Sequence, residues 1–199
     1  MTRIEDIEAA AHLGVDAVGL VFYSKSRRYV TPEQAQELVS RLPAFVTVTG
    51  LFLDPSSEDV QSIVEVVRVD LLQFHGSETP EFCRSFNRRY IKAVPMGSQV
   101  DICDYARKYS DAAALLLDSH AVGQKGGTGM TFEWSRVPQF DGPPLILAGG
   151  LKPSNVAAAI RSVHPYGVDV SSGVESGPGV KDARRMSQFI SEVNSVPNL

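Results

Sequence analysis

Seven short apolar runs alternate along the chain with longer stretches in which apolar residues recur at helical spacing. Runs that are apolar throughout are typical of strands buried on both faces of a parallel sheet, and the longer stretches supply the helical crossovers that parallel strands require. The predicted strands are residues 17–22, 46–53, 71–74, 90–94, 113–117, 145–148 and 167–170. This alternation restricts the chain to the α/β class.

Sequence signals also mark several helices. Thr31 and Thr79 are predicted N-caps, and each is followed by a proline at the first helical position. Gln34 completes a capping box with Thr31. Apolar residues at helical spacing predict the first and last helices over residues 3–13 and 181–193.

About eight helical stretches accompany the seven strands, and no predicted strand precedes residues 3–13. We therefore predict a single-domain (β/α)8 TIM barrel over residues 1–199 in which the first strand is missing. A closed barrel of this type has eight strands. The missing strand is expected to leave two sheet edges open and to lower the stability of the barrel.

Composition narrows the functional classes. The 199 residues carry a formal net charge of -4 without a basic patch, which disfavours a nucleic-acid partner. Neither a membrane-spanning run nor a signal sequence is apparent, so we expect a cytoplasmic protein with no membrane partner. Cys83 and Cys103 lack CxxC spacing and lie in predicted helices, which favours free structural thiols over a metal site or a disulfide.

Two predicted strands end in glycine-bearing loops that favour phosphate binding. Backbone N–H groups approach an anion closely at glycine, and a helix beginning at Pro153 would direct further N–H groups into the same space. In parallel barrels, the loops after the last two strands commonly bind phosphate. The residues predicted to bind it are Gly149, Gly150, Ser172 and Gly173.

Two charged residues follow predicted strands at the end where such barrels build active sites. Asp118 follows the run 113–117 and suits general acid catalysis, although a carboxylate there can also cap the next loop. Arg28 lies in the basic loop 23–29. It either binds a carboxylate through two parallel hydrogen bonds or belongs to a solvated loop.

Three further polar residues are predicted to line the pocket. Gln73 and His75 are two positions apart and therefore lie on one side of their strand, with His75 either a neutral wall residue or an acid–base group. Asp169 shares a face with Ser171 and either binds a substrate amine or hydroxyl or orders the glycine loop. The glycine-rich segment 123–129 lacks the phosphate-loop pattern and is predicted to close over the site.

Six motifs together resemble one enzyme family. They are VGLVFYSKSRRYVTPEQA, LLQFHG, LLLDS, GGTGMTFEW, LAGGLKPSNV and VDVSSGVESGPGVKD. In this order they are similar to the phosphoribosylanthranilate isomerases of tryptophan biosynthesis over nearly the whole chain. The resemblance implies conversion of N-(5'-phosphoribosyl)anthranilate to 1-(2-carboxyphenylamino)-1-deoxy-D-ribulose 5-phosphate by an Amadori rearrangement. It also implies a small-molecule substrate, no cofactor or metal, and a monomer or homodimer.

The resemblance implies roles for single residues as well. Asp118 corresponds to the general acid that helps to open the ribose ring, and Arg28 to the residue that binds the anthranilate carboxylate. The loops of Gly149 and Gly173 correspond to the phosphate site.

The family usually begins with a strand reading approximately KICG, whose cysteine is the general base. No counterpart precedes Met1, either because the sequence is a fragment or because the protein is a shortened relative, and neither Cys83 nor Cys103 is placed to replace it. We therefore expect the base to be absent and the activity of this chain to be doubtful. The alternative is a non-catalytic phosphosugar-binding relative. A histidine-pathway isomerase or an indole-glycerol-phosphate synthase fits the motifs less well.

Overall fold

Seven parallel strands form one sheet in the computed structural model, which describes residues 1–98, 100–119, 132–138 and 141–197. The strands are β1 (Ala17–Val21), β2 (Thr47–Phe52), β3 (Leu71–Phe74), β4 (Tyr90–Pro95), β5 (Ala114–Asp118), β6 (Leu145–Leu147) and β7 (Gly167–Val168). The predicted strands are confirmed, with shifts of at most two residues at an end. The segment 123–129, predicted to close over the site, lies outside the described residues.

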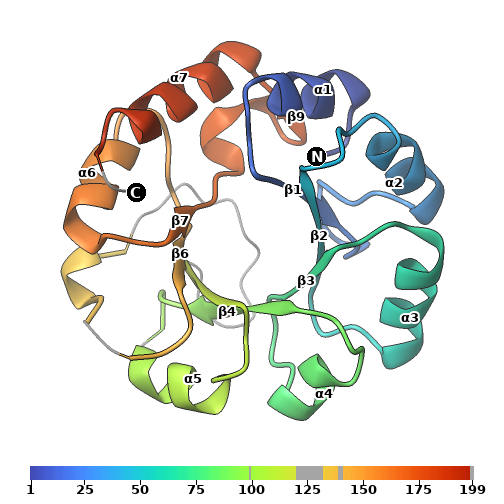
Figure 1. The fold of residues 1–199 in the computed structure, drawn as a ribbon, viewed down its shortest axis with the longest axis horizontal. Helices are drawn as coiled ribbons and strands as arrows, with labels where there is room; N and C mark the ends of the chain where they lie inside the picture. The colour runs from blue at the N-terminus through green and yellow to red at the C-terminus, as the bar shows by residue number, and fades with distance from the viewer. Residues whose placement is uncertain (99, 120–131, 139–140, 198–199) are drawn as a thin grey trace.

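Helices cover the outer side of the sheet (Figure 1). They are α1 (Ile4–His12), α2 (Pro32–Val39), α3 (Ser57–Val66), α4 (Pro80–Arg84), α5 (Ile102–Lys108), α6 (Val156–Val163) and α7 (Ala183–Asn194), with the short 3-10 helices η1 (Trp134–Arg136) and η2 (Ser172–Val174). Within the described part of the chain, none of them is both long and apolar enough to traverse a bilayer.

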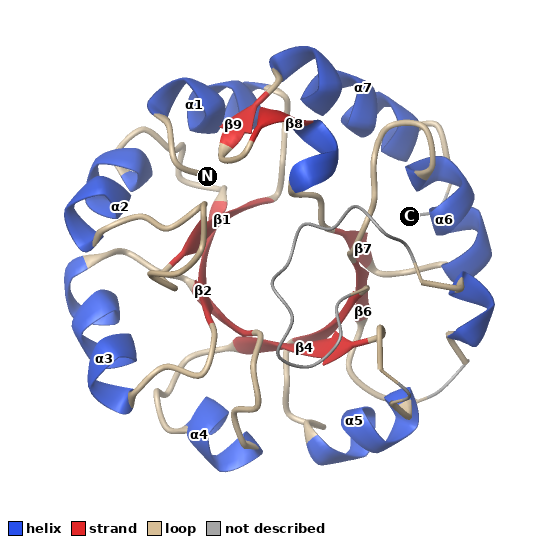
Figure 2. Cartoon of the chain, turned by 180° about the vertical axis from the view of Figure 1, so that it is seen from behind, coloured by secondary structure: helices blue, strands red, loops and turns tan. Residues whose placement is uncertain are grey.

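The sheet curves into an incomplete ring that the helices surround (Figures 1 and 2). Each strand pairs with its neighbour in chain order, and β1 and β7 are the two edges. Among the described residues, α1 is the first element and no strand precedes it. The predicted TIM-barrel arrangement, without a strand before the first helix, is therefore confirmed.

Side-chain caps fix the starts of two predicted helices. The Thr31 hydroxyl accepts a hydrogen bond from the backbone N–H of Gln34, and the Gln34 side chain accepts one from the backbone N–H of Thr31. The predicted capping box at α2 is thus confirmed. At α4, Thr79 accepts from the backbone N–H of Phe82, as its position before a proline indicated.

The last helix, predicted to begin at about residue 181, begins two residues later. Lys181 belongs to β9 (Val180–Lys181), which pairs antiparallel with β8 (Glu175–Gly177). The helix begins at Ala183, because the Asp182 side chain caps it by accepting from two backbone N–H groups. The hairpin pairing therefore delays the helix by two residues.

The helix predicted to begin at Pro153 starts later, at Val156. The Asn155 side chain accepts a hydrogen bond from the N–H of Lys152 and donates one to the carbonyl of Gly150. These two bonds hold the intervening residues in a turn. The phosphate site predicted at Gly149, Gly150, Ser172 and Gly173, here called the phosphate cup, therefore depends on the glycine loops. It does not include a helix N-terminus at Pro153.

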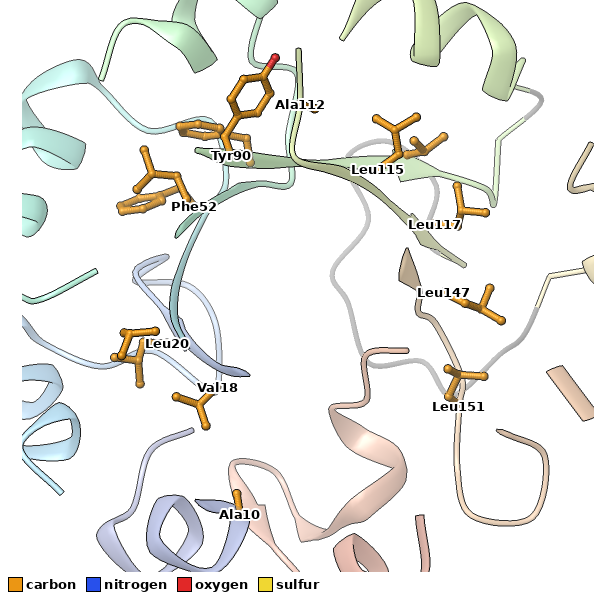
Figure 3. Close-up of a cluster of buried hydrophobic side chains, with 14 of the residues drawn as sticks. Ala10, Val18, Leu20, Phe52, Tyr90, Ala112, Leu115, Leu117, Leu147 and Leu151 are labelled. Atoms are coloured by element: carbon orange, nitrogen blue, oxygen red, sulfur yellow. The ribbon is translucent and has the colours of Figure 1, made fainter. Parts of the chain in front are cut away.

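The two faces of the sheet carry different side chains. Large apolar side chains of the outer face pack against the helices (Figure 3): Phe52, Tyr90, Leu115, Leu117 and Leu147. A separate cluster of mostly smaller side chains lies on the other face: Ile91, Ala93, Ala114, Leu116 and Ala148. Because successive strand residues alternate between faces, polar residues in step with the second set lie inside the ring.

A buried ion pair holds the loop between β3 and α4. The Nζ atom of Lys92, on β4, lies 2.8 Å from Oε2 of Glu78 and 2.6 Å from the carbonyl oxygen of Gly76. The two charged side chains are 1% and 2% exposed. The Glu78 carboxylate also accepts from the N–H groups of Gly76 and Asp54, so the pair is fully hydrogen-bonded. It ties the loop that follows β3 to the neighbouring strand.

We expect Glu78→Gln to lower the free energy of unfolding by about 3–5 kcal/mol, because it leaves the Lys92 ammonium buried without a counter-charge. Urea unfolding followed by circular dichroism measures the change. The control is Glu81→Gln, which removes an exposed carboxylate paired with Arg84 and is expected to leave the unfolding midpoint nearly unchanged. Equally small effects of both substitutions would contradict a structural role for the buried pair.

Candidate active site

Gln73 and His75, predicted to line the pocket, meet Asp118, the predicted general acid, at the carboxyl ends of β3 and β5. His75 follows β3, and its Nε2 lies 2.9 Å from Oδ2 of Asp118, the last residue of β5. Its Nδ1 lies 3.2 Å from the Nε2 of Gln73. The structure therefore brings together residues that are 43 positions apart in the chain. The inward side predicted for Gln73 and His75 agrees with this contact.

The arrangement orients the Asp118 carboxylate. A neutral imidazole protonated at Nε2 donates to Asp118 and accepts at Nδ1 from the Gln73 amide, which gives the chain of hydrogen bonds one consistent direction. The Asp118 side chain is only 11% exposed. A carboxyl group held in this way at the inner rim of the sheet can, in its protonated form, deliver a proton to a bound ligand.

Asp169 adds a second carboxylate to the same rim. It follows β7, and its backbone N–H donates to the carbonyl of Leu147 on β6. The pKa of the Asp169 carboxyl is raised, because surrounding atoms desolvate it and because the charge of Asp118 lies nearby. Its side chain is nevertheless reached by solvent, as expected at an open rim.

The two glycine loops lie against each other. Gly149 and Gly150 have φ angles of +77° and +66°, a backbone conformation that residues other than glycine rarely adopt. A Cβ atom on Gly173 would overlap the carbonyl oxygen of Leu151, so the loop after β7 packs directly on the loop after β6. The predicted halves of the phosphate cup are therefore adjacent.

The cup has polar groups to offer a ligand. Within the described part of the chain, the N–H groups of Gly149 and Gly150 donate to no other backbone group. The hydroxyl of Ser119 is buried beside Gly149, and it too lacks a hydrogen-bond partner among the described residues. Sequence reasoning missed Ser119, although it directly follows Asp118.

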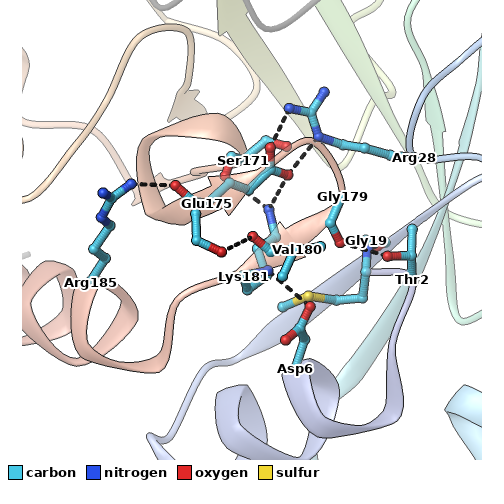
Figure 4. Close-up of polar contacts among 12 residues, drawn as sticks. Thr2, Asp6, Gly19, Arg28, Ser171, Glu175, Gly179, Val180, Lys181 and Arg185 are labelled. Carbon is cyan, nitrogen blue, oxygen red and sulfur yellow. Dashed lines mark hydrogen bonds and ion pairs between the residues drawn. The ribbon is translucent and has the colours of Figure 1, made fainter.

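Arg28 is not a freely solvated cation. Its Nε and Nη2 atoms each donate to the Glu175 carboxylate at 2.7 Å, and Nζ of Lys181 lies 3.1 Å from the same carboxylate (Figure 4). The bond to Glu175 raises the pKa of Arg28. Sequence reasoning missed Glu175 and Lys181. The only signal is that they flank the turn of the short hairpin.

The cysteines lie where the sequence predicted, on helices. Cys83 is buried on α4, and burial raises the pKa of its thiol to about 12. Cys103 lies on α5. Among the described residues, no group of three or more His, Cys, Asp or Glu side chains is arranged to hold a metal ion.

The chain is similar to one family over nearly its whole length. The family model "N-(5'phosphoribosyl)anthranilate (PRA) isomerase" matches residues 1–192. A curated relative of that name from Nitrosococcus oceani is 52% identical over 196 residues, covering 98% of this chain and 95% of the relative. The relative from Alcanivorax borkumensis is 52% identical over 202 residues, covering 98% and 93%.

Solved structures give the same result. Phosphoribosyl anthranilate isomerase from Thermotoga maritima matches with a TM-score of 0.89 and 38% identity, covering 98% of this chain and 96% of that one. A structure of the enzyme in complex with reduced 1-(o-carboxyphenylamino)-1-deoxyribulose 5-phosphate matches with a TM-score of 0.82 and 36% identity, with the same coverage. These matches do not support the expectation that the activity of this chain is doubtful.

We expect Gly173→Ala to weaken binding of ribulose 5-phosphate by about 10-fold or more, because the added Cβ displaces the loop and its N–H donors. Isothermal titration calorimetry measures the affinity. Gly167→Ala is the matched control, since a Cβ there meets no atom within 4 Å. Equal affinities of the two variants would argue against a phosphate site at this loop.

Proposed function

The chain belongs to the N-(5'-phosphoribosyl)anthranilate isomerase family, enzymes of tryptophan biosynthesis, and on this basis we propose the reaction that it catalyses and the residues that act in it. It converts N-(5'-phosphoribosyl)anthranilate to 1-(2-carboxyphenylamino)-1-deoxy-D-ribulose 5-phosphate. A single isomerase-like barrel domain spanning residues 1–199 carries the site. A cytoplasmic location stays a prediction.

The observation that carries the proposal is that Asp118, the glycine loop after β6 and the Arg28 loop after β1 all lie at the carboxyl ends of strands of one parallel sheet. The Asp118 carboxylate, oriented by His75, lies at the same rim as the glycine loops and the Arg28 loop. The substrate has a phosphate at one end and an anthranilate carboxylate at the other. The sugar ring that must open lies between these two groups, where the general acid is needed.

Asp118 donates a proton to the ring oxygen of the ribose, and the ring opens to a Schiff base with the anthranilate nitrogen. Loss of the proton from the neighbouring carbon gives an enolamine, which tautomerises to the ketone. The base that the family resemblance implies is a cysteine in a KICG-type strand, which has no counterpart in these 199 residues. Cys83 does not serve in its place, because its thiol is buried on α4.

Substrate binding is divided along the rim. Gly149, Gly150, Ser172 and Gly173 bind the phosphate through backbone N–H groups. Arg28 binds the carboxylate, while Gln73, His75 and Asp169 contact the sugar and the bridging nitrogen.

Loss of the fluorescence of N-(5'-phosphoribosyl)anthranilate measures the proposed reaction. The assay compares the 199-residue chain with the same chain extended by a KICG-type strand, and we expect conversion by the extended protein at least. Folded but inert protein in both cases would overturn the proposal. Saturable binding without conversion in both would instead favour a phosphosugar-binding relative.

Asp118→Asn is expected to reduce turnover by about 10²- to 10⁴-fold in the active protein, because an amide cannot supply the proton. Asp104→Asn is the control, since Asp104 is exposed on α5 and pairs with the exposed Arg107. It should leave turnover unchanged. Activity of Asp118→Asn within about twofold of the parent would exclude Asp118 as the general acid.

A further inference from the structure

A buried charge network on the β8–β9 hairpin contacts one side of the guanidinium of Arg28 (Figure 4). Glu175 accepts both Arg28 bonds, from Nε and Nη2, and also accepts from Lys181. The side chains of Glu175 and Lys181 are 5% and 6% exposed, whereas that of Arg28 is 19% exposed. Arg28 is therefore the member of the network that a ligand can reach.

Glu175 uses only one edge of the guanidinium. It takes the Nε–H and one N–H of Nη2, and no other described residue forms a hydrogen bond with Nη1 or with the second N–H of Nη2. One N–H of Nη1 and the second N–H of Nη2 form a second edge that matches a carboxylate with two parallel bonds. Arg28 can therefore accept a ligand carboxylate without releasing Glu175.

The charges of the network favour an anion. Two cations and one anion, Arg28, Lys181 and Glu175, leave one net positive charge. Burial acts to raise the pKa of Glu175, but its bonds to Arg28 and Lys181 outweigh this and hold the pKa below its usual range. Glu175 therefore stays ionised. A weaker electrostatic interaction joins Lys181 to Asp169.

The network also reaches the phosphate loop. Nζ of Lys181 donates to the carbonyl oxygen of Ser171 at 2.8 Å, directly before the 3-10 helix that contains Gly173. Arg185, on α7, donates to the backbone carbonyl of Glu175. Lys181 and Glu175 thus connect the loop at one end of the site to Arg28 at the other.

We propose that Glu175 and Lys181 are positioning residues that hold the free edge of Arg28 toward the substrate carboxylate at a fixed separation from the phosphate loop. The inference rests on the proposed role of Arg28. Under this proposal, preference for a substrate that carries a carboxylate depends on Glu175 and Lys181. These two residues hold Arg28 in place and do not themselves contact the substrate.

Calorimetric titration with two ligands tests the proposal. One is reduced 1-(o-carboxyphenylamino)-1-deoxyribulose 5-phosphate, and the other is the same compound without the carboxylate. In the parent chain we expect the first to bind more tightly. In Glu175→Gln we expect it to lose about 10- to 100-fold in affinity, while the second changes by no more than about twofold.

The direction of this change separates three roles. Glu175→Gln raises the net charge of the network, so a purely electrostatic role for Glu175 would strengthen binding of the carboxylate ligand. A merely structural role would weaken both ligands equally. Only positioning weakens the carboxylate ligand selectively, and either of the other two outcomes would overturn the proposal.

Glu78→Gln is the control for loss of a buried ion pair. It breaks the pair with Lys92, which does not involve Arg28. It should leave the ratio of the two affinities unchanged. If Glu175→Gln does not fold, Glu175→Asp replaces it: the charge is kept but the shorter side chain moves the carboxylate that holds Arg28, so the same selective loss is expected and an unchanged ratio counts against the proposal. If the parent chain binds both ligands with the expected preference but neither it nor the chain extended by a KICG-type strand converts substrate, the proposed function alone is refuted.

Discussion

The parallel direction of all seven strands is the constraint on which the rest of the structure depends. Parallel strands end at a common rim, so residues that follow different strands become neighbours there. Alternation along each strand then divides the side chains, with large apolar groups against the helices and small or polar groups inside the ring. Asp118 and His75 meet because each continues the inner set at the end of its own strand.

Two buried charge networks stand out in the described part of the chain, and each of their charges has a partner. Lys92 and Glu78 form a closed pair on the outer face, with the remaining bonds made to the backbone. Arg28, Glu175 and Lys181 differ, because two cations share one carboxylate and one edge of the guanidinium is left over. The first network supports a loop. The second is built to receive an anion, in keeping with the ligand chemistry of the isomerase family.

Short-range sequence patterns predicted the strands and the helix starts that depend only on neighbouring residues. The apolar runs identified the seven strands, and Thr31 with Gln34 predicted the start of α2 because a capping box involves only neighbouring residues. The hairpin that contains Lys181 escaped prediction, since its strands are three and two residues long and show no periodicity. The helix start predicted at Pro153 is wrong for a related reason. The side chain of Asn155 closes a turn there, so the helix begins later.

The fold class, the family and the residues at the strand ends can all be read from the amino-acid sequence, because they follow from the pattern of apolar runs and from contiguous motifs. Only the tertiary structure decided which of those residues touch. The contacts of Asp118 with His75 and of Arg28 with Glu175 span 43 and 147 positions, and no local pattern encodes such pairings. They arise from the curvature of the sheet, which brings distant strand ends and the hairpin to one rim.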